Sequence, residues 1–210
     1  MTAREVARLV NRRLVVCLTL LIGAACSESA RDATAPARQL ASPPSLHDVV
    51  ATSDTGVTVF TIDPTQDGLY PIPGGHFLYV EQGGVCDLAS PYGPDYWDTP
   101  CTPAATPTVV TAKSYLDALG HPRIDFQPAL RFFVQKGRLK TAAILFMHDT
   151  LAVRAPHAAI LYCDDSGACI DEGLRDKLLQ TDENQRSGYL YRQIKHFSGY
   201  EVAAGLTSEF

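Results

Sequence analysis

Short apolar runs separated by turn residues recur along the chain from residue 57 to residue 203. The runs are rich in Val, Ile, Thr, Phe and Tyr, which fit the pleated and half-buried surface of a strand. They stop at Pro, Gly, Asp or Ser, and no sustained helical period interrupts them. We expect strands at 57–62, 77–80, 108–112, 123–126, 130–134, 141–147, 158–162, 189–194 and 200–203. The pattern predicts an all-β fold, an antiparallel β-sandwich over residues 47–206.

Two segments within this pattern need a separate interpretation. The run at 141–147 is continuously apolar, which is typical of a strand buried on both faces. Residues 172–180 place Leu174, Leu178 and Leu179 on one helical face, but their flanks are polar and lack a good cap. We therefore expect a loop or a short helix at 172–180.

The first 25 residues have the two parts of a secretory signal peptide. An uninterrupted apolar stretch of 12 residues at 14–25 follows a positive segment with Arg4, Arg8, Arg12 and Arg13. A helix of that length is too short to span a hydrocarbon core of about 30 Å. A buried N-terminal helix would leave the arginines unexplained, so residues 1–25 are predicted to direct export. Their removal takes away four Arg and one Glu, which moves the formal net charge from −5 to about −8.

Cys26 ends the sequence Leu21-Ile22-Gly23-Ala24-Ala25-Cys26, which resembles a bacterial lipobox. In that motif small residues precede a cysteine that receives diacylglycerol, and each buried CH₂ of an acyl chain contributes about 0.8 kcal/mol to anchoring. Gly23, Ala24 and Ala25 also suit ordinary signal peptidase, so simple secretion stays open. Ser27 after the cysteine favours the outer membrane over the inner one.

These features predict an outer-membrane lipoprotein that faces the periplasm or the cell surface. The alternative is a soluble secreted or periplasmic protein. Residues 26–46 would supply the lipid-attachment cysteine and a flexible linker rich in Ala, Ser, Pro and Arg. An acidic mature chain has no electrostatic reason to bind nucleic acid or anionic lipid, so its membrane contact would be the lipid anchor.

Four cysteines remain after the leader and Cys26, namely Cys86, Cys101, Cys163 and Cys169. An even number in an exported chain indicates disulfides, and four cysteines allow three pairings. We favour the local pairing, Cys86–Cys101 and Cys163–Cys169, since one bridge closes a Pro- and Gly-rich loop and the other a turn at Ser166-Gly167. A four-cysteine zinc site is the rival, but the spacings lack a C-x₂-C pair.

Tyr92, Tyr96 and Trp97 lie in the loop between the first two of these cysteines. Exposed aromatic rings on such a loop could stack on a sugar or bind a partner. The alternative, which we favour, is that Trp97 plugs one end of the sandwich.

The segment Lys195-His196-Phe197-Ser198-Gly199-Tyr200 contains the tripeptide at which some proteins cut their own backbone. In that chemistry Ser198 attacks the carbonyl of Phe197 and His196 or a water takes the proton. The favoured interpretation is structural, with Phe197 in the core of a closing strand and Gly199 permitting a bend.

Metal and cofactor sites are weakly indicated. His148, Asp149 and His157 could meet as ligands, although such residues more often mark strand ends. Asp164, Asp165, Asp171 and Glu172 form no oxygen-ligand loop of the calcium-binding kind. Phosphate-loop, hydrolase-elbow and zinc-helix motifs are missing from the sequence, so we expect no cofactor, no metal and no enzyme.

Three stretches in order resemble the ZU-five domain family. They are 74–80 with Gly84-Val85-Cys86, then 124–132, then 188–202 with its His-Phe-Ser. The resemblance covers roughly residues 55–204 and implies a ZU-five-like or immunoglobulin-like β-sandwich. Such domains are mostly structural and protein-binding modules, and relatives cut themselves at His-Phe-Ser.

The predicted leader and the resemblance together favour a non-enzymatic exported lipoprotein, a surface or periplasmic structural or protein-binding module, with an unknown protein or glycan partner. A self-processing domain that cuts between Phe197 and Ser198 is the first alternative. A carbohydrate-binding module that uses Trp97 is the second.

Overall fold

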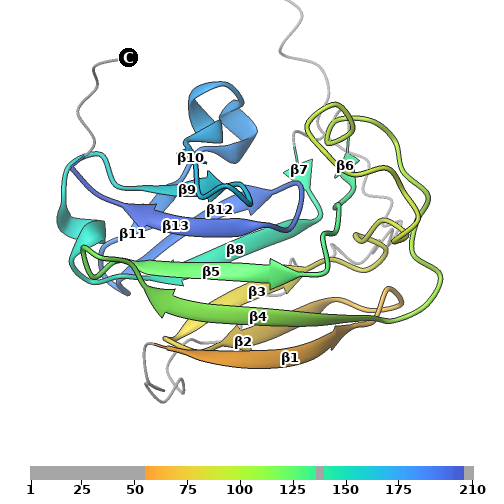
Figure 1. Ribbon diagram of the computed structural model, residues 1–210, viewed down its shortest axis with the longest axis horizontal. Helices are drawn as coiled ribbons and strands as arrows, with labels where there is room; N and C mark the ends of the chain where they lie inside the picture. The colour runs from red at the N-terminus through yellow and green to blue at the C-terminus, as the bar shows by residue number, and fades with distance from the viewer. Residues whose placement is uncertain (1–54, 136–139, 206–210) are drawn as a thin grey trace, which may run out of the picture. The chain divides into compact units, whose positions relative to one another are not determined.

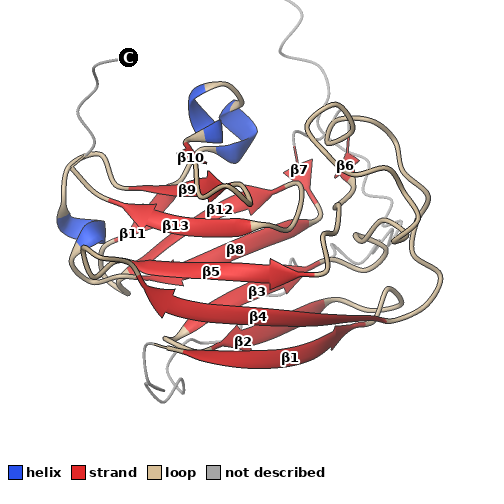
Figure 2. Cartoon of the chain, in the orientation of Figure 1, coloured by secondary structure: helices blue, strands red, loops and turns tan. Residues whose placement is uncertain are grey.

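Antiparallel strands dominate the computed structural model, which describes residues 55–135 and 140–205. These residues belong to one compact unit, His47–Phe210. The predicted leader at 1–25, Cys26 and the predicted linker at 26–46 lie outside the described residues. The helical segments described are short 3-10 turns (Figure 2), and no helix among the described residues is long and apolar enough to cross a membrane.

The first sheet has six strands in the order β1-β4-β5-β13-β9-β10. All neighbouring pairs are antiparallel. Their bounds are β1 Gly56–Ile62, β4 Thr108–Leu116, β5 Pro122–Gln127, β13 Gly199–Ala203, β9 Ala159–Cys163 and β10 Cys169–Ile170. Along β4 buried and more exposed residues alternate, as expected of a strand with one face on the core.

The second sheet has five strands in the order β11-β12-β8-β3-β2, and it lies behind the first in the view of Figure 1. Its bounds are β11 Asp182–Asn184, β12 Tyr189–Ile194, β8 Ala143–His148, β3 His76–Val80 and β2 Gly68–Ile72. A separate short pair joins β6 Val134–Gln135 to β7 Lys140–Thr141. The predicted all-β class with two antiparallel sheets is confirmed.

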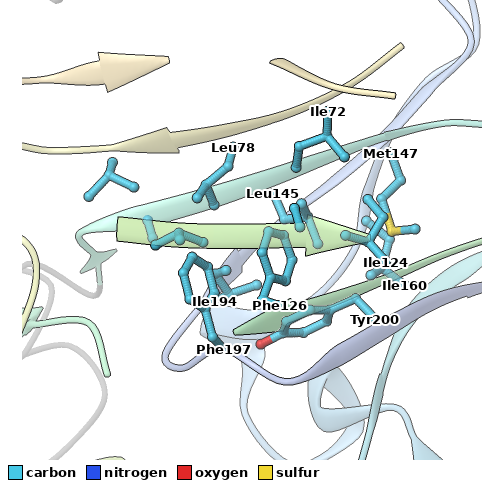
Figure 3. Close-up of a cluster of buried hydrophobic side chains, with 14 of the residues drawn as sticks. Ile72, Leu78, Ile124, Phe126, Leu145, Met147, Ile160, Ile194, Phe197 and Tyr200 are labelled. Carbon is cyan, nitrogen blue, oxygen red and sulfur yellow. The ribbon is translucent and has the colours of Figure 1, made fainter. Parts of the chain in front are cut away.

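The core fills the space between the two sheets (Figure 3). Ile124, Phe126, Ile160 and Tyr200 come from the six-stranded sheet and Leu145 from the five-stranded sheet. Each of these side chains is almost fully buried. Burial at roughly 25 cal/mol per Å² of apolar surface makes this interlayer contact the main driving force for folding.

The chain crosses from one sheet to the other at residues 195–198. β12 of the five-stranded sheet ends at Ile194, and β13 of the six-stranded sheet begins at Gly199. Phe197 is buried and stacks on Phe126 with ring centroids 4.3 Å apart. The expected closing strand is therefore interrupted, because these four residues connect the two layers and make only single backbone contacts, such as the hydrogen bond from Phe126 N–H of β5 to the carbonyl of Ser198.

Three other expectations change in detail. β8 has only one fully buried face, since Ile144, Phe146 and His148 are half-buried, so the apolar run does not mark burial on both sides. The strand expected at 130–134 is mostly isolated bridges, one of which joins Arg131 to His196. Residues 172–180 form two 3-10 turns, Glu172–Leu174 and Lys177–Leu179. Three strands were not predicted from the sequence. β2 contains Pro71, β10 has only two residues, and β11 is a short segment with two acidic residues.

Candidate functional site

Two disulfides shape the segments around the crossover. Cys86 and Cys101 are bonded with their Cα atoms 5.7 Å apart. Cys163 and Cys169 are bonded across the β9–β10 pair, where they are register partners, with Cα atoms 4.0 Å apart. This is the pairing that the sequence favours, and such bridges are typical of oxidising compartments.

The loop between Cys86 and Cys101 is held down by a buried arginine. Arg131 donates to the carbonyl of Pro91 at 2.8 Å and to the carbonyl of Thr99 at 2.6 Å. Charged donors to backbone carbonyls make strong hydrogen bonds, so this irregular loop has a defined position. The loop thereby places Tyr92 and Trp97 against the crossover.

Trp97 lies face to face with His196 of the crossover, with ring centroids 3.7 Å apart. Tyr162 meets Trp97 edge-on at 5.3 Å and His196 edge-on at 4.7 Å. The Trp97 ring is half-buried in this cluster, which leaves one of its faces unavailable to a sugar. Tyr96, the third aromatic residue proposed for binding, is exposed.

A buried ion cluster contacts the edge of the His196 ring at Nε2. Glu172 accepts from Arg192 at 2.7 Å, and His196 Nε2 lies 3.2 Å from the second carboxylate oxygen of Glu172. Burial lowers the pKa of His196, against the opposing effect of Glu172. The neutral ring therefore donates through Nε2, and its buried Nδ1 has no hydrogen-bond partner among the described residues.

The charge of Glu172 is retained inside the protein. Burial raises the pKa of its carboxyl, but the hydrogen bonds from His196 and Arg192 and the charge of Arg192 outweigh that effect and bring the pKa below the ordinary 4.5. Beside this cluster, Lys195 pairs with Asp98 and with Asp176, the latter at 2.5 Å. The crossover is thus fixed by charged groups on or beside the 3-10 turns and on the loop between Cys86 and Cys101, which we call the aromatic loop.

The peptide bond between Phe197 and Ser198 has a polarised carbonyl. The hydroxyl of Tyr92 donates to the carbonyl oxygen of Phe197. The hydroxyl of Ser198 donates to the carbonyl of Cys163 at 2.9 Å. Burial raises the pKa of Tyr92, and a hydrogen bond with Ser198 partly offsets that rise. Ser198 and Tyr92 are therefore neighbours at the bond that self-processing would cut.

A groove opens beside this bond on the outer face of the six-stranded sheet. Its volume is about 940 Å³. Strands β4, β5 and β13, the aromatic loop and the turn after β9 all contribute to its wall. The lining residues are Tyr92, Val109, Thr111, Arg123, Asp125, Phe126, Gln127, Pro128, Ala129, Tyr162, Asp164, Asp165, Ser166, Phe197, Ser198 and Gly199.

Charges in the groove are organised around Arg123. Its guanidinium lies 3.3 Å from Asp125 and 3.2 Å from Glu201, and Tyr115 donates to Asp125 at 2.8 Å. A Cβ atom at Gly199 would lie 2.9 Å from Asp125 Oδ1, so the absence of a side chain keeps this wall open. The groove offers carboxylates, a guanidinium, amide and hydroxyl groups together with two tyrosine rings.

Three of the carboxylates considered as metal ligands, Asp149, Asp164 and Asp171, have other partners in the structure. Asp149 pairs with His121 at 2.8 Å, and the backbone N–H of His148 donates to His76 at 2.9 Å. Asp164 and Asp171 accept hydrogen bonds from the backbone of their own turns. Within the described part of the chain, one group of three possible ligands comes together, Cys163, Cys169 and Glu201, and both of its sulfur atoms are in the disulfide.

Several residues of this region had no signal in the sequence. Arg123, Asp125 and Tyr162 reach the groove only because β5 and β9 both flank β13. Arg192 meets Glu172 across 20 residues of sequence, through tertiary packing rather than a motif.

Comparison of the chain with protein-family models, with curated proteins and with solved structures gives no match. The fold and the site themselves define the class, an antiparallel two-sheet β protein with two disulfides and a polar groove on one sheet.

Proposed function

We propose that this protein is a non-enzymatic exported module that binds another protein through the groove on its six-stranded sheet. The groove carries the proposal, because it joins two tyrosine rings, hydrogen-bonding groups and paired charges in one concave surface. Partner sites on proteins commonly combine such aromatic and arginine contacts with polar groups. An extended polar segment of the partner would fit along β4 and β5.

The proposed setting is the cell envelope. The two disulfides support an oxidising compartment, and the predicted signal peptide and Cys26 support a lipid anchor on the outer membrane. The resemblance to ZU-five domains supports the same role, because that family consists mostly of structural and protein-binding modules.

Site-specific photo-crosslinking in the producing cell tests the groove. A photoreactive phenylalanine replaces Thr111, which lines the groove on β4, and in a matched variant it replaces Lys113 on the same face two residues further along. We expect a discrete protein adduct from position 111 and a much weaker one from position 113. Equal adducts at both positions, or none at either, would contradict the proposal.

Self-processing is a second candidate, favoured by the hydrogen bond from Tyr92 to the Phe197 carbonyl. Ser198 Oγ would attack that carbonyl carbon while a base takes its proton, and Tyr92 would stabilise the oxyanion. The C–N bond then breaks, the nitrogen of Ser198 takes a proton, and an ester joins Phe197 to the Ser198 oxygen. Water hydrolyses the ester to the Phe197 carboxylate and a free Ser198 hydroxyl.

Intact mass under denaturing conditions decides between the two functions. A binding module gives a single mature chain that is uncut between Phe197 and Ser198. Self-processing gives a species that ends at Phe197, which disappears in Ser198→Ala and forms more slowly in Tyr92→Phe.

A further inference from the structure

The free edge of β1 differs from the other sheet edges of the molecule. β1 and β10 are the outer strands of the six-stranded sheet, and β11 and β2 are those of the five-stranded sheet. Within residues 55–135 and 140–205, β1 pairs on one side only, with β4. An outer strand presents unpaired N–H and C=O groups that attract another strand, and natural proteins usually protect such edges.

Three of these four edges carry recognisable protection. β10 has two residues and β11 has three, of which Asp182 and Glu183 are charged. β2 contains Pro71, which has no N–H to donate. Short length, charge and proline are all devices that block edge-to-edge pairing.

β1 has none of these devices. Its seven residues, GVTVFTI, include no charged residue and no proline. Val57 and Val59 are 61% and 63% exposed on its outer face. Phe60 on the inner face is only partly buried and stacks on Tyr70 of β2, with ring centroids 4.6 Å apart. A long, uncharged and apolar edge strand of this kind is a template for pairing.

We infer that β1 is an interface at which two copies of this chain pair antiparallel, edge to edge, about a two-fold axis at Val59. The strand is self-complementary in that register. On the outer face Val59 meets its own counterpart and Val57 meets Thr61, and on the inner face Thr58 meets Phe60. These are β-branched and aromatic pairs, which stabilise antiparallel strands.

Charge also favours a second copy over a foreign strand. The protein carries a net negative charge, yet β1 has no charge that would repel its own copy or select an oppositely charged partner. In the proposed register Asp63, the first acidic residue after β1, lies opposite Thr55 and not opposite its own counterpart. A closed two-fold pair also hides both apolar edges at once, which limits further growth.

Sedimentation equilibrium of the purified protein and two matched variants tests the inference. Val59→Lys brings two ammonium groups together at the two-fold axis, whereas Val109→Lys places the same change on β4, where Val109 is 59% exposed. We expect a dimer for the unchanged chain and for Val109→Lys. For Val59→Lys we expect the dimer affinity to be weaker by at least about tenfold. Both valines are exposed, so both variants should fold, which circular dichroism checks.

A cysteine variant tests the register directly. Val59→Cys should form a covalent dimer on mild oxidation, because residue 59 faces its own counterpart, whereas Val109→Cys should remain unlinked. A monomeric unchanged chain would overturn the inference, whatever else covers the edge. Dissociation by both lysine variants would also overturn it, because it would indicate packing through the sheet face and not pairing of the edges.

Discussion

At the scale of single residues, the crossover depends on buried charge. Arg192 is almost fully buried, and its guanidinium has the carboxylate of Glu172 as its ionic partner at 2.7 Å. A buried ion pair contributes little in net terms when intact, because desolvation offsets attraction, but the loss of one partner is severe. Glu172 also receives the hydrogen bond of His196, so one side chain holds both a core strand and the crossover.

Replacement of Glu172 by Gln should lower the free energy of unfolding by about 3–5 kcal/mol, because it leaves the Arg192 charge buried and uncompensated. Urea denaturation followed by circular dichroism measures the change. Glu201→Gln is the matched control, since Glu201 pairs with Arg123 in a more exposed place and such a pair contributes at most about 1 kcal/mol. Equal losses in the two variants would refute this account.

Stability should fall as the pH falls from 6.5 towards 4, and His76 should be one cause. Burial, followed by the charge of His148, lowers the pKa of His76 from 6.5 to about 4. Because the folded protein disfavours the protonated ring, the stability that the neutral His76 contributes is fully present above pH 6.5. It is lost as the pH falls towards the folded-state pKa of about 4. The difference between the unfolded-state and folded-state pKa values of His76 corresponds to a loss of about 3 kcal/mol in the free energy of unfolding.

The variant His76→Asn keeps an acceptor for the backbone N–H of His148 but does not titrate. Its unfolding free energy should depend less on pH between 6.5 and 4 than that of the unchanged chain. His157→Asn serves as the control, because His157 is exposed and Asn tolerates its positive φ of 54°. An unchanged pH slope in His76→Asn would show that another group is responsible.

At the scale of elements, the aromatic loop is the segment whose order depends most on covalent restraint. The Cys86–Cys101 bridge joins cysteines with a sequence separation of 15, and the Cys163–Cys169 bridge joins cysteines with a separation of 6. The loop presses Trp97 on His196 and carries Tyr92 to the Phe197 carbonyl. The backbone hydrogen bonds within the loop are local turns, such as Tyr96 N–H to Gly93 and Thr99 N–H to Tyr96, so the bridge and Arg131 tie the loop to the rest of the domain.

Replacement of both Cys86 and Cys101 by Ala should lower the free energy of unfolding by about 3 kcal/mol in the chain-entropy treatment. The same change at Cys163 and Cys169 should have a smaller effect, about 2 kcal/mol, because the closed loop is shorter. Only the first pair should also shift the fluorescence of Trp97, the single tryptophan of the chain. The reverse order of the two effects would contradict this ranking.

At the scale of the whole molecule, the two-sheet domain is preceded in the sequence by a proposed lipid anchor and a proposed linker. The groove and the β1 edge lie on one sheet, since β4 lines the groove and pairs with β1. A second copy paired with β1 would therefore extend the six-stranded sheet that carries the groove. The turn after β9, which also lines the groove, lies towards the opposite end of that sheet and would stay uncovered.

The anchor itself can be tested in the producing cell. Cys26→Ser should move the protein from the membrane fraction to the soluble fraction and abolish labelling by a fatty acid, because the acyl chains are lost and an acidic mature chain has no electrostatic attraction to anionic lipid. Ser27→Asp is the matched control, which should keep the label but favour the inner membrane. Membrane retention and labelling in Cys26→Ser would rule out the proposed anchor.

The sequence by itself determined most of the strands and the all-β class, because alternating β-branched runs and turn residues are local signals. The pattern Val57-Thr58-Val59-Phe60 is a strand in any context that buries one of its faces. It also indicated the two cysteine pairings, since each bridge closes a short local loop.

Only the tertiary structure decided what surrounds the His196-Phe197-Ser198 segment. Its neighbours Trp97, Tyr162 and Glu172 come from three separate parts of the chain, and no local pattern fixes which of them meet. The position of β1 at the edge of the sheet formed by the described residues was equally invisible in the sequence, because an edge strand and a central strand share the same alternation and differ only in their neighbours.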